Sequence, residues 1–172
     1  MKKFKFEVNS LFKSLSVLFI AGFFIAIASV NALASDATTI DSQMLASINE
    51  LRAQNGLSAL TLDSNLVSIA ETRSEEASVL WSHTRPNGGK GADMISHDKW
   101  RGENLSYVTY SNYSGSDSEQ SSAASLMFKN LCNSPSHYDN MVFSSYTKIG
   151  IATSVSQTDG GTKVTTAYMF SN

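Results

Sequence analysis

Two segments near the C-terminus constrain the fold more than any other feature of this chain. Residues 148–156 and 164–170 each alternate apolar side chains with others, the pattern of β-strands that bury one face. Asp159-Gly160-Gly161 between them is a signal for a tight turn. The two segments therefore predict an antiparallel hairpin, and the rest of the chain must supply whatever covers its apolar face.

Helical periodicity dominates the region before the hairpin. Ile40, Met44, Ile48 and Leu51 recur at helical spacing, and Gly56 is a stop signal, so a helix is predicted from 40 to 55. A third helix, from 117 to 133, is predicted to end at Pro135 and to leave the following residues in a loop.

The second helix is predicted to begin after Asp63. The Asp63 side chain can cap the first turn, and Leu62 can staple onto Val67. The inward stripe is expected to consist of Leu66, Ala70, Arg73 or Ala77, Leu80 and Trp81. Residues 84–99 are rich in glycine and have no sustained period, which is typical of a loop.

The first 34 residues have the form of a secretory signal peptide. Lys2, Lys3, Lys5 and Lys13 precede an apolar run from Leu15 to Val30, and Ala32-Leu33-Ala34 is a small-x-small cleavage site. The rival interpretation is an uncleaved anchor, but the apolar run is shorter than the roughly 20 residues of a spanning helix. We expect cleavage after Ala34, a secreted protein with no stable membrane span, and a single domain from 35 to 172.

Charge limits the partners of the mature chain. Removing residues 1–34 takes away four of the 13 Lys and Arg and one of the 15 Asp and Glu, which leaves 9 against 14, a net charge of about −5. The nine basic residues are scattered, whereas binding to nucleic acid draws on clustered Lys and Arg. We therefore expect no nucleic-acid partner. Cys132 is the single cysteine, so no intrachain disulfide can form.

Chemistry-bearing residues gather in three short segments: SHTRPNG at 82–88, GEN at 102–104 and NSPSHYDN at 133–140. Taken alone, each has an ordinary explanation. His83 could meet the end of a helix dipole, Glu103 could be a solvated carboxylate, and His137 could bond to backbone in a loop.

In this order the segments, together with KIGIA at 148–152 and the opening NELRAQNGLSALTLDSNL, resemble the CAP superfamily of cysteine-rich secretory, antigen 5 and pathogenesis-related 1 proteins, in its bacterial secreted, SCP-like form. The resemblance covers roughly 45 to 170. It implies an α+β fold, a three-layer α/β/α sandwich with a central antiparallel sheet. It also implies an open cleft in which two histidines and acidic residues meet.

The resemblance assigns cleft positions residue by residue. His83 resembles the first cleft histidine, Glu103 the first cleft acid and His137 the second histidine. Many eukaryotic members carry a second acid on the helix before the second histidine, but residues 120–136 contain no Asp or Glu. Glu119 and Asp139 are the candidate replacements, although Ser116 and Glu119 have the spacing of a capping box.

Two neutral imidazoles and a carboxylate are a plausible set for zinc or another divalent ion, with His83, His137 and Glu103 as metal ligands. Tyr138 and Asn104 are expected at the rim of the cleft. The function expected from these residues is that of an extracellular binding domain, which takes up a metal ion and an unidentified ligand of lipid, glycan or peptide character, rather than that of an enzyme.

Three alternatives stay open. The cleft could belong to a metal-dependent peptidase or other hydrolase with Glu103 as catalytic base. It could be a lipid- or cell-wall-binding module without metal, or the histidines could only tie loops together. Thiol catalysis by Cys132 with His137 has weaker support, and no serine lies in a G-x-S-x-G elbow. The ligand, the oligomeric state and any association with the cell wall cannot be read from the sequence.

Overall fold

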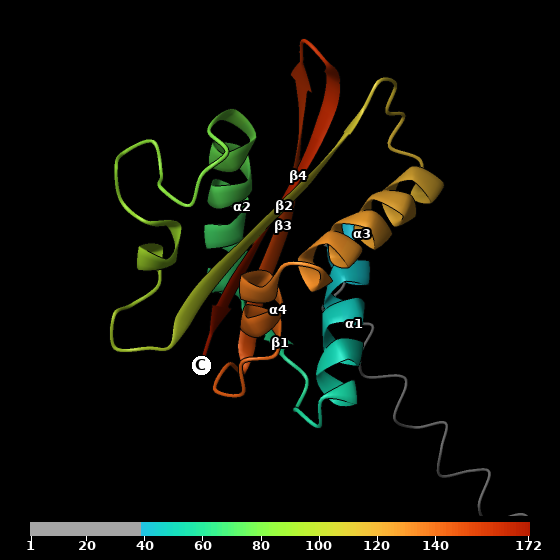
Figure 1. Ribbon diagram of the computed structural model, residues 1–172. Coiled ribbons are helices and arrows are strands. Elements are labelled where there is room, and N and C mark those ends of the chain that lie inside the picture. Colours follow the sequence, from blue (N-terminus) through green and yellow to red (C-terminus); the bar gives the residue numbers. More distant parts are fainter. Residues whose placement is uncertain (1–38) are drawn as a thin grey trace, which may run out of the picture. The chain divides into compact units, whose positions relative to one another are not determined.

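A four-stranded sheet in the order β1-β3-β4-β2 forms the middle layer of the molecule (Figure 1). The computed structural model describes residues 39–172, so the predicted signal peptide lies outside the described residues. The elements in chain order are α1 (Thr39–Gln54), β1 (Thr61–Leu62), α2 (Ser64–Val79), the 3-10 turn η1 (Gly91–Met94), β2 (Arg101–Tyr110), α3 (Asp117–Cys132), α4 (Pro135–Met141), β3 (Lys148–Thr158) and β4 (Gly161–Ser171). Among the described residues, no helix is long and apolar enough to cross a membrane.

The sheet is largely the antiparallel one that was expected. β3 and β4 form the predicted hairpin, with Thr158 opposite Gly161 across the two-residue loop, and β4 pairs antiparallel with β2. The exception is β1, which pairs parallel to β3 over two residues. The sheet is therefore mixed at one edge.

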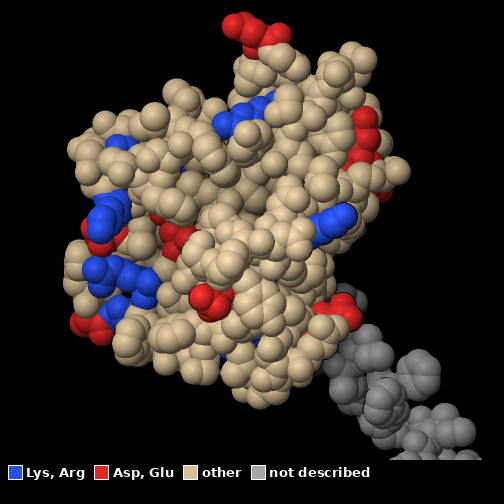
Figure 2. Space-filling model, viewed as in Figure 1, with Lys and Arg blue, Asp and Glu red and all other residues tan. Residues whose placement is uncertain are grey.

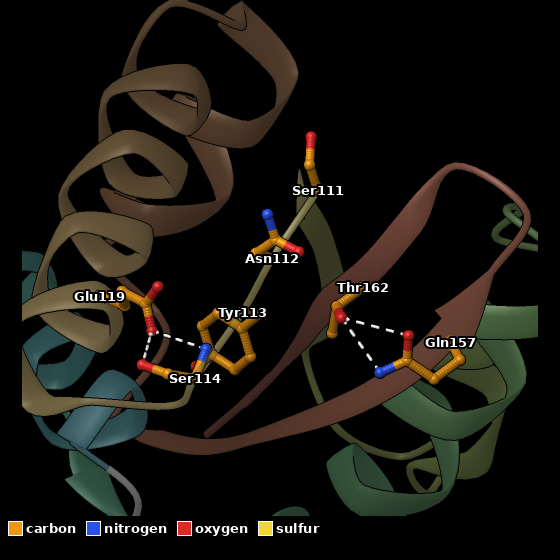
Figure 3. Close-up of a pocket in the computed structure, with 7 residues that line it drawn as sticks. All are labelled: Ser111, Asn112, Tyr113, Ser114, Glu119, Gln157 and Thr162. Carbon is orange, nitrogen blue, oxygen red and sulfur yellow. Dashed lines mark hydrogen bonds between the residues drawn. The ribbon is translucent and has the colours of Figure 1, made fainter.

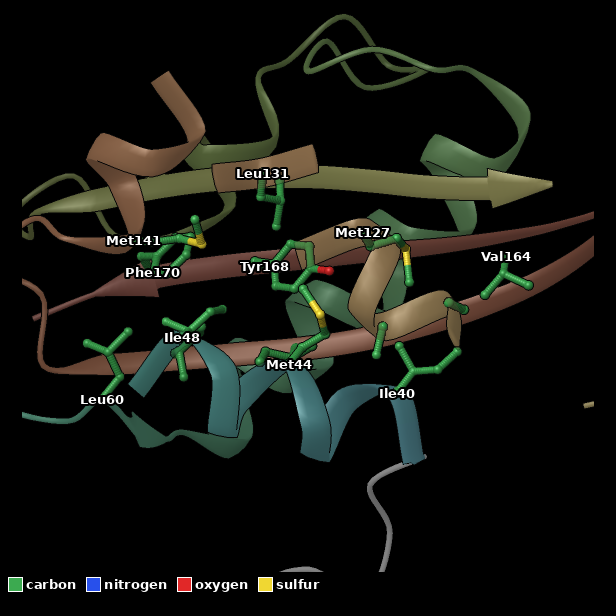
Figure 4. Close-up of a cluster of buried hydrophobic side chains, with 14 of the residues drawn as sticks. Ile40, Met44, Ile48, Leu60, Met127, Leu131, Met141, Val164, Tyr168 and Phe170 are labelled. Atoms are coloured by element: carbon green, nitrogen blue, oxygen red, sulfur yellow. The ribbon is translucent and has the colours of Figure 1, made fainter. Parts of the chain in front are cut away.

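Helices cover both faces of the sheet and complete the predicted three-layer α+β sandwich. The larger core cluster lies between the sheet and α1, α3 and α4, and includes the buried residues Ile40, Met44, Ile48, Met127, Leu131, Tyr168 and Phe170 (Figure 4). The smaller cluster lies under α2 and includes Leu66, Ala70, Ala77, Ala167 and Met169. Because alternate residues of a strand point to opposite faces, β4 contributes Tyr168 to one layer and Met169 to the other.

The helix starts follow the capping rules. Asp63 accepts hydrogen bonds from the backbone N–H groups of Asn65 and Leu66 at the start of α2. Ser116 and Glu119 form the predicted capping box of α3. Asp63 and the capping box each satisfy backbone donors that the first helical turn leaves without partners.

Two sequence predictions about helix ends are wrong. Leu80 and Trp81 were expected in the inward stripe of α2, but the helix ends at Val79 and the backbone turns extended at Leu80, so both side chains are about half exposed. Pro135 does not open a loop. It is the first residue of α4, a position at which its missing N–H costs nothing.

Gly150 sets the distance between α2 and the sheet. A Cβ atom at this position would lie 2.0 Å from the carbonyl carbon of Leu66 in α2. The helix backbone therefore rests directly on the strand. This close approach also fixes how deep the side chains of α2 reach toward β2 and β4.

A buried arginine joins the end of α1 to the end of α4. Arg52 is 1% exposed and donates hydrogen bonds to the backbone carbonyls of Ser58, Met141, Phe143 and Tyr146. Burial lowers the pKa of its guanidinium. Two of these bonds, to Met141 and Tyr146, are buried, where a carbonyl that loses its donor is costly, so Arg52 holds in place the short helix that carries His137.

Candidate functional site

His83 lies on the loop that follows α2, and the loop is shaped by turn residues. The N–H of Gly88 donates to the carbonyl of Arg85 across the Pro86-Asn87 turn, and Gly88 has a φ of +88°. Gly91 returns to donate its N–H to the carbonyl of His83. These hydrogen bonds fix the backbone at His83, whose side chain is 59% exposed.

Glu103 lies on β2, and its two carboxylate oxygens have different surroundings. Oε1 accepts hydrogen bonds from Nε and Nη2 of Arg73, at 3.1 and 2.9 Å. Oε2 is buried and has no hydrogen-bond partner in the described part of the chain. It lies 3.7 Å from Nδ1 of His83. The site therefore contains a buried acceptor directed at an exposed imidazole.

Arg73 extends this pair into a charged network. Its side chain is fully buried and also bonds to Glu76 and to the carbonyl of Ser82. Glu76 in turn accepts from Arg85 on the loop of His83. The hydrogen bonds from Arg85, with those from Arg73, hold the pKa of the Glu76 carboxyl below its usual range, and the Glu76 carboxylate raises the pKa of Arg85. Two cations and two carboxylates balance, so the network has no formal net charge.

Sequence reasoning missed the role of Arg73 and placed it only in a helical stripe. The signal was present, because a cation at an inward-facing helical position needs a buried partner. The sequence alone could not indicate which of the carboxylates in the chain supplies it. The structure identifies Glu103, 30 residues further along, as the partner across the layer boundary.

His137 lies on α4 and faces His83. The centroids of the two rings are 6.4 Å apart, with 47° between their planes. Burial, and secondarily the charge of His83, lower the pKa of His137 below its ordinary value. The structure thus brings together the three residues predicted from the SHTRPNG, GEN and SPSHYDN segments.

The predicted rim residue Asn104 lies in the interior instead. Asn104 is fully buried, donates to the carbonyl of His137 at 2.9 Å and accepts from Asn140. It was expected at the rim of the cleft, but its side chain points to the face of the sheet opposite that of Glu103, as the side chains of adjacent strand residues do. Asn104 therefore positions α4. The hydroxyl of Tyr138 donates to Asn55 at the end of α1.

The candidate additional acids do not join the histidines. Glu119 bonds to Ser114 and Ser116 at the start of α3, and Asp139 is exposed on α4 with no ion pair within residues 39–172. In that same part of the chain, no three His, Cys, Asp or Glu side chains are placed to hold a metal ion together. A metal site here would rest on the two histidines.

The backbone covers Glu103 on its far side. A Cβ atom at Gly91 would lie 1.8 Å from Oε2 of Glu103, so only a glycine fits there. Arg73 occupies the other oxygen, so the side of the carboxylate that is left faces His83. The Glu103 side chain itself is only 3% exposed. Glu103 can orient the imidazole, but it does not face solvent as a free base would.

Two recesses occur away from this site. One, of about 440 Å³, lies where the start of α3 faces the β3–β4 hairpin and is lined by polar side chains that include Glu119, Gln157 and Thr162 (Figure 3). The other, of about 350 Å³, lies between α2 and β3. On the face seen in Figure 2, several basic side chains lie beside acidic ones at the left, and most of the surface is uncharged.

Comparison with known proteins shows the family and the fold of the chain. The sequence profile of the cysteine-rich secretory protein family, CAP, matches residues 45–170. Similar structures include an outer surface protein from Borrelia burgdorferi, with a TM-score of 0.58 and 17% identity over 77% of this chain and 92% of that one. A comparison with curated proteins by sequence finds no match.

Two further structures have the same fold. An extracellular protein from Bacillus anthracis that contains an SCP domain has a TM-score of 0.53 and 19% identity over 75% of this chain, which spans only 39% of the Bacillus protein. Manganese-bound Ac-ASP-7, an Ancylostoma-secreted protein, has a TM-score of 0.54 and 14% identity over 78% of this chain and 68% of its own. The names of these relatives place them at the cell surface or outside the cell. With the family profile covering most of its length, the chain belongs to the CAP, or cysteine-rich secretory protein, family.

Proposed function

We propose that this protein acts outside the cell as a binding domain that holds a divalent metal ion between His83 and His137. The observation that carries the proposal is the buried Oε2 of Glu103, which has no hydrogen-bond partner among the described residues and lies 3.7 Å from Nδ1 of His83. A carboxylate behind an imidazole favours the tautomer with the proton on the near nitrogen and leaves the far nitrogen free for a metal. Glu103 is then an orienting residue, not the third metal ligand expected from the sequence.

The spacing of the histidines is close to that of a shared ion. A metal bound at about 2.1 Å by one nitrogen of each imidazole, at a tetrahedral angle, would place the ring centroids roughly 5.3 Å apart. The observed separation is 6.4 Å, so the two rings would approach each other by about 1 Å when the ion binds. The lowered pKa of His137 also keeps this ring neutral and able to bind metal.

A metal held by only two histidines has open coordination positions, and when bound it would supply a positive charge for an oxygen of the extracellular ligand. Zinc is the first candidate because imidazole is among its common ligands. Manganese is the second, because one protein of this fold is described as manganese-bound. The burial of Glu103 gives less support to a hydrolase in which this carboxylate is the catalytic base.

Calorimetric titration tests the metal site directly. The chain from residue 35 onward, made metal-free, would be titrated with zinc and with manganese at pH 7.5 and pH 5.5. We expect one ion per chain at pH 7.5, weaker binding at pH 5.5, and no binding by the His83→Ala/His137→Ala double variant. His97→Ala is the matched control, because His97 bonds to Arg101 away from the pair. Binding that survives the double variant would contradict the proposal.

Secretion needs its own test. Expression of the full chain in a bacterial host, followed by N-terminal sequencing of the protein in the medium, should give Ser35 as the first residue. Replacing Ala32 and Ala34 by leucine removes the small side chains of the cleavage site. That variant should stay uncleaved, whereas cleavage at an unchanged position would show that Ala34 does not mark the site.

A further inference from the structure

Most of the outer edge of β3 has no partner strand. β1 pairs with Lys148 and Ile149 only, and from 150 to 158 the one strand that pairs with β3 within residues 39–172 is β4, on its other side. A free strand edge presents a row of backbone N–H and C=O groups that can pair with another extended chain.

The hydrogen bonds to β1 identify which groups point outward. The carbonyl of Ile149 accepts from the N–H of Asp63, on the β1 side. In a strand, the N–H and C=O groups of alternate residues point to the same edge. The backbone groups of Ile151, Thr153 and Val155 therefore point away from β4, toward the unpaired edge.

This edge lacks the usual devices that prevent pairing. Residues 151–157, IATSVSQ, contain no charged residue and no proline. The register with β4 runs without a bulge from Lys148 to Thr158. Natural sheets commonly block a free edge with lysine, proline or a bulge. The outermost strand on the opposite side of the sheet, β2, packs instead against η1 and α4.

A recess with a defined charge lies beside the edge. The recess of about 350 Å³ is bounded by residues 152–155 of β3 and by Glu71, Ser74, Glu75 and Ser78 of α2. Glu71 and Glu75 are exposed and one helical turn apart, and no cation of the described residues pairs with either. The side chains of an added strand that point toward α2 would meet two carboxylates.

We propose that residues 151–157 of β3 bind an extended, basic peptide segment of another protein by strand addition. The peptide backbone pairs with the outward groups of Ile151, Thr153 and Val155, and alternate Lys or Arg side chains face Glu71 and Glu75. Main-chain pairing supplies affinity and the alternate side chains supply specificity in this mode of recognition. A second copy of the chain fits less well, because edge-to-edge pairing would bring like-charged carboxylates together.

The test begins with selection of binders to the chain from residue 35 onward out of a displayed library of randomised heptapeptides. We expect enrichment of peptides with Lys or Arg at alternate positions. Affinity of the consensus peptide, measured by fluorescence anisotropy, should fall about tenfold or more in Val155→Pro, which removes one outward N–H and no bond to β4. Val155→Ala is the matched control and should bind like the wild type.

Two further measurements separate the parts of the proposal. Glu71→Lys/Glu75→Lys should reverse the charge preference of the selection. N-methylation of alternate peptide residues should abolish binding without any change to the protein, which keeps the test valid if Val155→Pro does not fold. The Val155 amide should exchange quickly in the free protein and slowly with peptide bound.

Three outcomes would overturn the proposal. The first is a selection that enriches no basic peptides. The second is an affinity that changes neither with N-methylation nor with Glu71→Lys/Glu75→Lys. The third is slow exchange at Val155 in the free protein together with a dimer in sedimentation, which would assign the edge to a second copy of the chain.

Discussion

Arg73 holds Oε1 of Glu103 with two hydrogen bonds, at 3.1 and 2.9 Å, while Oε2 of the same carboxylate lies 3.7 Å from an exposed imidazole. Oε1 of Glu103 is therefore held by the fold, whereas Oε2 is available to the site. Stability and function are coupled through this single side chain, and the variants below are chosen to separate them.

Removing Arg73 should destabilise the protein strongly. Arg73→Leu leaves the Glu103 carboxylate buried without its cation, and breaking a buried ion pair costs about 3–5 kcal/mol. The Arg73→Leu/Glu103→Leu double variant should recover part of this loss, because no unpaired charge stays buried. Urea unfolding of Arg73→Leu, Glu103→Leu and the double variant measures the coupling energy between the two side chains. Additive losses would show that the pair is not an energetic unit.

Arg85 provides the matched comparison on the same network. Its side chain is 21% exposed and bonds to Glu76 at the outer end. Arg85→Leu should cost about 1 kcal/mol or less, as is usual for partly solvated pairs. A loss as large as that of Arg73→Leu would contradict the distinction between the two arginines.

The titration of His137 should report the proximity of His83. The pKa of His137 is lowered by burial and then by the charge of His83, so an NMR titration should give a midpoint below its ordinary value of 6.5. In His83→Ala the midpoint should rise, and in His97→Ala it should not change. Because the folded protein favours neutral His137, this residue's contribution to stability is complete above about pH 6.5 and is lost as the pH falls through the lowered midpoint.

Arg52 should matter for the site although it is not part of it. Arg52→Met removes the Arg52 hydrogen bond from four backbone carbonyls, and we expect a loss of about 3 kcal/mol or more in the free energy of unfolding. Amide exchange should quicken first in α4, which carries His137. Arg52→Lys should be intermediate, because an ammonium group cannot reproduce the planar arrangement of donors.

Asp63 should make the start of α2 sensitive to acid. Hydrogen bonding from the Leu66 backbone, together with the charge of Lys148, lowers the pKa of its carboxyl below the ordinary 3.8, against an opposing effect of burial. The resulting stability is present above that value and lost as the pH falls through the lowered pKa. Asp63→Ala should cost about 1 kcal/mol at pH 7 in thermal unfolding. This difference should shrink at pH values below the lowered pKa, and a constant difference would show that charge plays no part.

The sequence predicted the elements whose signals are local. The hairpin turn, the Asp63 cap and the capping box at Ser116 are each decided within a few residues, and all three are present in the structure. The family resemblance then supplied the layered arrangement, which no local pattern could give.

Strand β2 was missed for a physical reason. Its segment RGENLSYVTY contains Gly, Glu and Asn, which are depleted in strands, yet all three are buried. Their burial depends on partners far along the chain, such as Arg73 for Glu103 and the backbone of His137 for Asn104. The residues that build the site are therefore the ones that make this strand difficult to predict from the sequence.

Pro135 shows the limit of a stop signal. A proline ends the helix before it and is equally suited to begin the next one. The sequence could not choose, because the choice depends on Asn104 and Asn140, which fasten α4 to β2. Assigning His137 to a loop was wrong for this reason, although its place opposite His83 was predicted.

The contact at Gly150 fixes the distance between α2 and the sheet, on which the geometry of the site depends. The α2 backbone packs so closely on Gly150 that there is room only for the hydrogen atom of a glycine. Any larger side chain at this position would push the helix away from the sheet and withdraw Arg73 from the Glu103 carboxylate on β2. A substitution there would touch neither histidine, yet it would release the one oxygen that Arg73 restrains and let Glu103 swing away from His83. The alignment of the two imidazoles with their carboxylate is thus decided on a third strand, at a residue without a side chain.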